Sequence, residues 1–339
     1  MSDRKKHGQK NQKKGATDPK KAALKRGQKG TAKSSALSSK SAKSAANANA
    51  LQGELVVGVI GGSGLYDIQG LTDVREVEIS TPFGAPSDAY ITGVLEGVRM
   101  VFLPRHGRGH RISPSEINFR ANIWGMKKLG VTRILSVSAV GSMQKNIHPG
   151  DFVVIDQFFD RTRHRADTFF TDGVVAHVMF ADPVCAGLRK TLLQAGKKLK
   201  LKCHDGGTYV NMEGPQFSTR AESKIYRQWG VDVIGMTNLQ EAKLAREAEI
   251  CYATIAMATD YDCWHEDHDD VTVGAIIAVM NKNVGNAKKL ILEAIPRLAP
   301  QGDCACGTAL KSAIMTAHDR IPPEAQLRLG LLIGKYVGG

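Results

Sequence analysis

Hydrophobic residues are distributed very differently on the two sides of residue 54. Beyond it, short continuous apolar runs such as ELVVGVI alternate with longer segments in which apolar residues recur at helical spacing. The runs lack the apolar and polar alternation of a strand with one face in water, so they predict strands buried on both faces. They span 54–60, 100–103, 133–139, 151–156, 208–212, 231–236 and 251–259.

Helical patterns separate several of these runs. Four of them, at 115–130, 181–200, 220–230 and 239–249, close near a glycine or a basic cluster, which is typical of helix C-termini. A long amphipathic helix is expected at 271–295 and a further helical stretch at 307–318. Strands alternating with helices predict a layered α/β fold, in which ligands bind beyond the carboxyl ends of the strands. We expect one folded domain over 53–318, and the extension over 319–339 fits no predicted element.

Residues 1–50 carry nearly all of the net charge. Their 14 lysines and arginines face only Asp3 and Asp18, so this segment accounts for +12 of the chain's +13. A segment so poor in apolar residues cannot offset the entropy cost of ordering, and we expect a disordered tail. It is interpreted either as a solubilising arm or as a weak, nonspecific binder of polyanions such as nucleic acid. It contains no aromatic residue that could stack on bases.

The location of the protein is predicted from its apolar segments. None approaches the roughly 18 residues needed to span a bilayer, and none follows the basic start as a secretory signal would require. These patterns predict a cytoplasmic protein.

The six cysteines divide into two groups. Cys185, Cys203, Cys251 and Cys263 lie in apolar or mixed segments, where a reduced core thiol is expected. Cys304 and Cys306 form a C-x-C pair, which could be a strained disulfide, a pair of soft-metal ligands, or neither. Because no second pair stands at zinc-site spacing, we expect no bound metal.

Hydroxyl and cationic groups follow four of the predicted strands. The first lies in the glycine-rich turn GGSGL, which fits neither a GxGxxG motif, a P-loop nor a G-x-S-x-G elbow and could be a simple tight turn. Strand ends converge at one edge of a layered sheet, so these groups are expected to form an oxyanion site, with phosphate as the anion. In it Arg105 would bind by two hydrogen bonds and His106 would donate one. The full set is Ser63, Arg105, His106, Ser138 with the amide of Ala139, and Thr237.

The stretch ATDYDCWHEDHDD, residues 258–270, has the composition of a metal site. Its second half contains HEDH, which lacks the HExxH spacing of a zinc helix, so a solvated loop or helix start is favoured. Asp260 and Asp262 instead end an apolar strand. Their two-residue spacing predicts that both side chains point to the same side of the strand.

From about Val56 to Met315 the chain resembles the methylthioadenosine phosphorylases of the trimeric purine nucleoside phosphorylase superfamily. The resemblance rests, in chain order, on GVIGGSGLYD, TPFGAPSDA, RHGRGHRISPSEINFRANIW, VSAVGS, PGDFVVIDQFFDRT, EGPQFSTRAES, VIGMTN, EAKLAREAEICYATIAMATDYDCW and DCACGTALKSAI. It implies a layered α/β/α nucleoside phosphorylase-type fold with a central mixed sheet. The implied enzyme is a homotrimeric pentosyltransferase of purine and methionine salvage, which uses phosphate to cleave 5′-methylthioadenosine and needs no metal or organic cofactor.

The resemblance also implies roles for individual residues. The strand-end groups would hold phosphate, with serine at positions 63 and 138 where the family often carries threonine. Asp260 would protonate N7 of the leaving adenine, and Asp262 would accept a hydrogen bond from its 6-amino group. The base pocket would comprise Phe217, Ser218, Ile234, Met236 and Tyr261. Val273, Ile276 and Ile277 would form an apolar site for the methylthio group, and His177 would reach the substrate's 5′ end from a neighbouring subunit.

Three other functions remain open at this stage. The nearest is an enzyme of the same fold that prefers 5′-methylthioinosine or another purine nucleoside. A second is a nucleic-acid-binding protein that acts through its basic tail, and a third is a metal-dependent hydrolase built on the acidic cluster. Gln240 replaces a proline common in the family, which leaves the detailed shape of the loop after Thr237 open.

Overall fold

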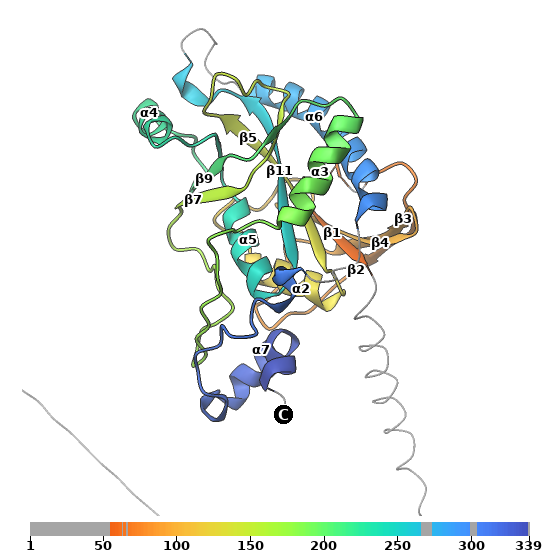
Figure 1. Ribbon diagram of the computed structural model, residues 1–339, viewed down its shortest axis with the longest axis vertical. Helices are drawn as coiled ribbons and strands as arrows, with labels where there is room; N and C mark the ends of the chain where they lie inside the picture. The colour runs from red at the N-terminus through yellow and green to blue at the C-terminus, as the bar shows by residue number, and fades with distance from the viewer. Residues whose placement is uncertain (1–54, 63, 66, 266–272, 299–303, 338–339) are drawn as a thin grey trace, which may run out of the picture. The chain divides into compact units, whose positions relative to one another are not determined.

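The computed structural model describes residues 55–62, 64–65, 67–265, 273–298 and 304–337 (Figure 1). The side chains of Val273, Ala275 and Ile276 also lie outside this description. The basic tail, Ser63 and the acidic run after His265 are therefore not described. Within the described residues, eleven strands form one mixed sheet flanked by helices, which confirms the predicted fold class.

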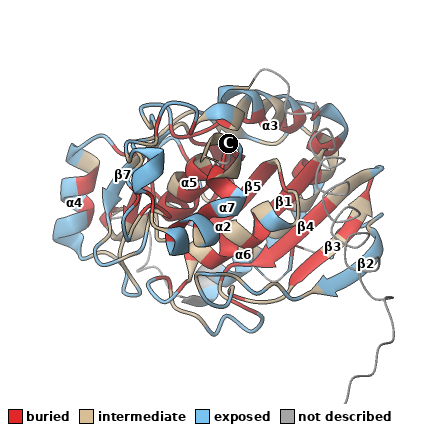
Figure 2. Ribbon diagram, turned by 90° about the horizontal axis from the view of Figure 1, so that it is seen from below, coloured by how far each residue is buried: buried red, intermediate tan, exposed pale blue. Residues whose placement is uncertain are grey.

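Four parallel strands form the centre of the sheet. They are β4 (Val98–Pro104), β1 (Val56–Gly61), β5 (Arg133–Ser142) and β11 (Cys251–Asp260), in that spatial order. In β11, nine successive residues are buried, so both faces of the strand are covered and alternation is absent from its sequence. Figure 2 shows the same extensive burial along β1, β4 and β5.

The remaining strands extend the sheet on both sides of this centre. Beyond β4 lie β3 (Tyr90–Leu95) and β2 (Thr72–Val77), both antiparallel to their neighbours. The sequence did not predict β2, which is mostly exposed and rich in charged residues and so lacks an apolar run. Beyond β5 lie β10 (Val233–Gly235), β9 (Thr208–Met212) and β7 (Gln157–Arg161), while β6 (Phe152–Val154) and β8 (Cys203–Asp205) continue from β11.

The sheet divides at the carboxyl end of β5. There β5 pairs with β11 on one side and with β10 on the other, so that Gly141 stands opposite both Asp260 and Ile234. The ends of β5, β11 and β10 therefore lie side by side where the sheet divides. Ligands of layered α/β proteins bind beyond the carboxyl ends of strands at such positions.

The helices pack in pairs against the sheet. Among the described elements, α2 (Phe119–Lys128) packs against α5 (Asn238–Glu247), and α3 (Ala186–Lys198) packs against α6 (Val273–Ala294). Both α5 and α6 also contact β11 and β5. α4 (Arg220–Gln228) contacts the turn that follows β11. In the described part of the chain, no helix has both the length and the apolar character needed to cross a membrane.

The C-terminal region differs from the prediction. The prediction of a helix at 307–318 is wrong. A 3₁₀ turn occupies Ala305–Thr308, and Ile314 then pairs in extended conformation with Ala176. Backbone groups that would form hydrogen bonds within a helix instead form them with the paired segment. The helix lies farther on, as α7 (Pro323–Val337), and its Leu329 and Ile333 are buried in the main hydrophobic core. The segment beyond residue 318 thus packs onto the same core as the sheet.

Candidate active site

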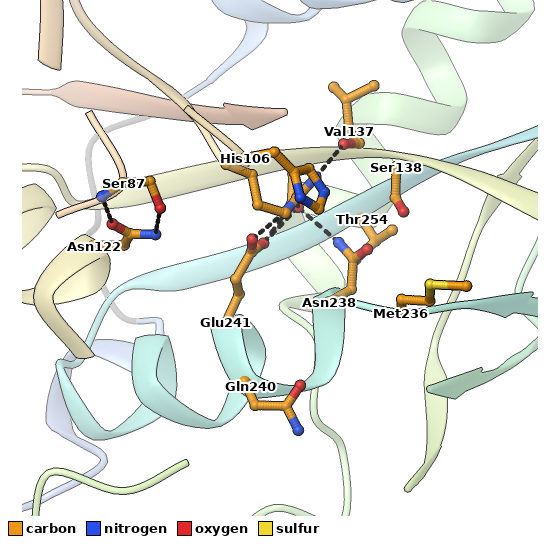
Figure 3. Close-up of polar contacts among 12 residues, drawn as sticks. Ser87, His106, Asn122, Val137, Ser138, Met236, Asn238, Gln240, Glu241 and Thr254 are labelled. Atoms are coloured by element: carbon orange, nitrogen blue, oxygen red, sulfur yellow. Dashed lines mark hydrogen bonds and ion pairs between the residues drawn. The ribbon is translucent and has the colours of Figure 1, made fainter. Parts of the chain in front are cut away.

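Arg105 lies directly after β4 and is almost completely buried. Its Nε and Nη2 donate to the two carboxylate oxygens of Glu241 at 2.5 and 3.1 Å. Nη1 donates to the carbonyl of Val137 at 3.0 Å, and Nη2 also donates to Ser136 Oγ at 2.6 Å (Figure 3). These contacts use four of the five N–H donors of the guanidinium.

The prediction that Arg105 binds the anion by two hydrogen bonds must therefore be corrected. In this structure its bidentate partner is Glu241, because a buried guanidinium requires a counter-charge. Glu241 is itself held by the hydroxyls of Ser136 and Tyr252, at 2.7 and 2.9 Å. One N–H of Arg105 remains for a ligand.

The structure brings Ser138 and Thr237 together through Tyr209. The hydroxyl of this buried tyrosine lies 3.3 Å from Ser138 Oγ and is also hydrogen-bonded to the backbone of Thr237. Thr237 is the N-cap residue of α5, and its side chain makes no capping hydrogen bond to the helix. Ala139 is exposed at the next position of β5.

His106 is predicted to donate to the anion, and its geometry changes that role. Its Nδ1 donates to the carbonyl of Ile112 at 2.8 Å, since a carbonyl oxygen can only accept. Burial, together with the positive charge of Arg105, lowers the pKa of His106 to about 4. The ring is therefore neutral near pH 7, and its Nε2 is a hydrogen-bond acceptor rather than a donor.

Asp260 and Asp262 lie at the carboxyl end of β11, beside Gly141. A Cβ built on Gly141 would lie 3.0 Å from Asp260 Oδ1 and 3.4 Å from Asp262 Cβ. The reason predicted for their proximity is wrong, because β11 ends at Asp260 and Asp262 occupies the following turn with φ +54°. The turn, rather than strand alternation, brings the second carboxylate back beside the first.

Burial raises the pKa of both carboxyl groups. Asp260 Oδ1 accepts the backbone N–H of Asp262 at 2.8 Å, and Oδ2 accepts from the Thr259 hydroxyl at 2.7 Å. These bonds only partly offset the effect of burial on the pKa of Asp260. For Asp262 burial is again the largest cause of the raised pKa, with a contribution from the nearby Asp260 charge. A carboxyl with a raised pKa can hold and donate a proton.

Two of the predicted base-pocket residues, Ile234 and Ser218, lie close to these carboxyls. Ile234 approaches Gly141 from β10, with its Cγ2 3.0 Å from the position of an added Cβ. The Ser218 hydroxyl donates to Met212 Sδ at 3.7 Å and also lowers the pKa of Asp262, which partly offsets the effect of burial. Phe217 is 59% exposed, as a side chain at an open site would be. Met236 lies in the loop between β10 and α5.

Other predicted residues lie elsewhere in the subunit. Tyr261 is buried, stacks edge-on against Trp264 and contacts His148 Nδ1 through its hydroxyl, so it is part of the core. His177 is exposed, and its backbone N–H donates to Ala313 of the C-terminal segment at 2.8 Å. Ile277 is exposed on α6, and the side chains of Val273 and Ile276 are not described.

Sequence reasoning missed the residues that support the site. Arg165 donates to the carbonyls of Met236 and Glu213, each at 2.5 Å, and so ties together the two loops that carry base-pocket residues. Gln240 accepts from Arg165 at 3.1 Å within α5, which accommodates the departure from proline. In the sequence, Arg165 and Glu213 appear only as charged residues within polar motifs. Their hydrogen-bond partners can be identified only from the fold.

Comparison with known proteins gives consistent matches. The model of the phosphorylase superfamily matches residues 56–296. The S-methyl-5′-thioadenosine phosphorylase of Geobacter sulfurreducens is 63% identical over 285 residues, covering 84% of this chain and 100% of that protein. The protein of the same name from Koribacter versatilis is 58% identical over 282 residues, covering 83% and 97%.

Solved structures agree with these sequence relatives. A methylthioadenosine phosphorylase from an antarctic soil metagenomic library is 48% identical with a TM-score of 0.79, over 83% of this chain and 99% of that one. The Schistosoma mansoni methylthioadenosine phosphorylase in complex with adenine is 37% identical with a TM-score of 0.74, over 78% and 100%. By sequence, by fold and by the residues gathered at the end of β11, the chain belongs to the S-methyl-5′-thioadenosine phosphorylase family of the phosphorylase superfamily.

Proposed function

We propose that the protein catalyses phosphorolysis of 5′-methylthioadenosine to adenine and 5-methylthio-α-D-ribose 1-phosphate, as a pentosyltransferase of purine and methionine salvage. The high identity to proteins of that name over most of the chain supports this activity. The observation that carries the chemistry is the partly buried pair Asp260 and Asp262, with raised pKa values, at the end of the central strand.

Cleavage of the glycosidic bond requires stabilisation of the departing base. Adenine leaves with negative charge on its ring, so a protonated carboxyl hydrogen-bonded to N7 lowers the barrier. Asp260 performs this step because burial raises the pKa of its carboxyl and so favours the protonated acid. Asp262 accepts from the 6-amino group, and a 6-oxo purine would instead place an acceptor against this carboxylate. A buried polar group left without its partner costs about 1–3 kcal/mol, which favours a 6-aminopurine.

Phosphate is the nucleophile in this proposal. The groups that hold it are Ser63, Arg105, His106, Ser138, the amide of Ala139, and Thr237. Arg105 contributes its one remaining N–H, with most of its charge balanced by Glu241. His106 accepts the O–H of hydrogen phosphate at Nε2, because its Nδ1–H is already bound to Ile112. This arrangement turns the deprotonated phosphate oxygens toward the anomeric carbon.

The bond to adenine loosens first, toward an oxocarbenium-like ribose, and phosphate then attacks the anomeric carbon. Positioning and electrostatics account for most of the rate, without a covalent enzyme intermediate. We further propose that catalysis needs no cofactor, that the enzyme is cytoplasmic, and that it acts as a homotrimer. In the trimer His177 would reach the 5′ end of the substrate bound to a neighbouring subunit, where Ile277 and its apolar neighbours hold the methylthio group.

The direct test is adenine release from 5′-methylthioadenosine with and without inorganic phosphate. The wild type should release adenine only with phosphate, and Asp260→Ala should lower kcat by about 10²–10⁴-fold, the usual contribution of a general acid. Release that is independent of phosphate would indicate a hydrolase. Faster phosphorolysis of 5′-methylthioinosine or inosine would favour the alternative purine nucleoside phosphorylase.

A further inference from the structure

Four cysteines from separate parts of the chain meet at the amino end of β11. Cys251 is the first residue of this strand, Cys185 directly precedes α3, and Cys304 and Cys306 lie at the 3₁₀ turn of the C-terminal segment. Their four Sγ atoms all lie within 4.8 Å of one another. Cys185, Cys251 and Cys306 are buried, and Cys304 is partly exposed.

The spacing of these sulfurs suits a shared metal ion. Cys304 Sγ lies 3.7 Å from that of Cys185 and 3.5 Å from that of Cys251, and no disulfide joins any two of the four cysteines. A Zn–S bond of about 2.3 Å in a tetrahedral site places neighbouring sulfurs about 3.8 Å apart. A disulfide would require a separation of about 2.05 Å. The two sulfur separations made by Cys304 thus match the edge of a tetrahedral thiolate site, and the other sulfurs lie within 4.8 Å of one another.

A cationic side chain also lies beside the four sulfurs. Arg133 Nη1 donates to Cys251 Sγ at 2.9 Å, which places a guanidinium against the cluster. A metal ion binds cysteine as the thiolate, so an ion among these sulfurs would stabilise the deprotonated form.

We propose that Cys185, Cys251, Cys304 and Cys306 bind one Zn²⁺ in a closed tetrahedral site. Four protein ligands leave no open position for substrate, so the site is structural. It lies at the opposite end of β11 from Asp260, nine residues away, which is about 30 Å along a strand. The ion would fasten the C-terminal segment, which pairs with residues next to His177, to the central strand and to α3.

This site was not expected from the sequence. The C-x-C motif lacks a second pair at zinc-site spacing, so its cysteines had no visible partners. The fold provides them as two single residues, one at the start of a strand and one before a helix, 66 residues apart in the chain. Ligands scattered in this way leave no local sequence signature.

The test measures metal content on the tag-free full chain, purified in reducing buffer, incubated with Zn²⁺ and desalted. We expect one Zn²⁺ per chain by elemental analysis, and loss of most of it in Cys306→Ser and in Cys251→Ser. Cys203→Ser is the matched control, because Cys203 is a half-buried thiol outside the cluster, and it should retain the ion. If the buried variants do not fold, Cys304→Ser, at the partly exposed position, replaces them.

Cobalt provides a second measurement that identifies the ligands. Co²⁺ exchanged into the wild type should give intense thiolate-to-metal charge-transfer absorption and the visible bands of a tetrahedral ion, both lost in the cluster variants. Removal of the metal should lower the Tm and leave the reaction rate of the folded enzyme at 25 °C unchanged. Folded, reduced wild type that retains no Zn²⁺ after desalting, or that binds it equally in all the variants, would overturn the proposal. Two cluster cysteines joined in a disulfide in the reduced preparation would do the same.

Discussion

At the scale of single residues, the buried ion pair of Arg105 and Glu241 governs the phosphate side of the site. Both side chains are almost fully buried, and Glu241 takes most of the donors that Arg105 could offer to a ligand. Arg105 therefore acts with its charge largely balanced and in a fixed orientation. The site therefore differs from one in which an unpaired arginine binds phosphate by two hydrogen bonds.

The ion pair leads to a prediction on stability. Glu241→Ala leaves a buried guanidinium without its counter-charge and should lower the free energy of unfolding by about 3–5 kcal/mol. Replacing both partners, as in Arg105→Met with Glu241→Leu, should restore much of this loss but should not restore the low KM for phosphate. Urea unfolding and phosphate titrations measure the two effects. A double variant as unstable as the sum of its single changes would contradict this account.

Gly141 leads to a prediction on catalysis. A methyl group there would lie 3.0 Å from both Asp260 Oδ1 and Ile234 Cγ2, closer than these atoms tolerate without moving. Gly141→Ala should therefore lower kcat/KM for 5′-methylthioadenosine by about tenfold or more, ~1.4 kcal/mol in the barrier. Gly330→Ala is the control, because α7 has open space there and alanine favours a helix. Near-wild-type kinetics for Gly141→Ala would show that the carboxyls do not depend on this close approach.

At the scale of secondary structure elements, the start of α4 positions one wall of the base pocket. Thr219 and Glu222 form a capping box, with Thr219 Oγ1 accepting from the Glu222 N–H and the Glu222 side chain accepting from the Thr219 N–H. Phe217 and Ser218 directly precede this cap. The cap therefore determines how the loop meets Asp262.

Thr219→Ala should lower stability by about 1 kcal/mol, the usual cost of losing an N-cap side chain. Because the loop would lose its anchor, KM for 5′-methylthioadenosine should rise while kcat changes little. Thr191→Ala within α3 removes a half-buried threonine that caps no helix, and it should affect neither quantity strongly. An unchanged KM in Thr219→Ala would show that the helix cap does not influence substrate binding.

The predictability of each element follows from its burial. β11 and β5 were evident because strands covered on both faces are continuous apolar runs. β2 was missed because its side chains face water. The end of β11 was foreseen as a carboxylate pair, but the turn that brings Asp262 back beside Asp260 depends on a positive φ that no spacing rule reveals. The partners of Arg105 and the four-cysteine cluster depend on contacts between distant segments, which a single sequence does not encode locally.

At the scale of the whole molecule, the proposed trimer leads to a complementation experiment. His177 lies next to Ala176, which pairs with Ile314 of the C-terminal segment, whereas the carboxyls lie at the end of β11. His177→Ala and Asp260→Ala homomers should each be nearly inactive at low substrate. Trimers assembled from both variants contain some sites with an intact Asp260 and an intact neighbouring His177, and activity should reappear in them. Activity equal to the average of the two separate variants would place His177 in its own subunit's site or outside catalysis.

The central claim is that Asp260 and Asp262 select and protonate a 6-aminopurine. The most direct measurement compares kcat/KM for 5′-methylthioadenosine and 5′-methylthioinosine in the wild type, in Asp260→Asn and in Asp262→Asn, each of which replaces one carboxyl by an amide of the same shape. We expect the wild type to prefer the adenosine by about tenfold or more, Asp262→Asn to lose or reverse this preference, and Asp260→Asn to lose rate on both nucleosides. An Asp262→Asn enzyme that keeps its preference for the adenosine, or an Asp260→Asn enzyme that keeps its rate, would contradict the claim.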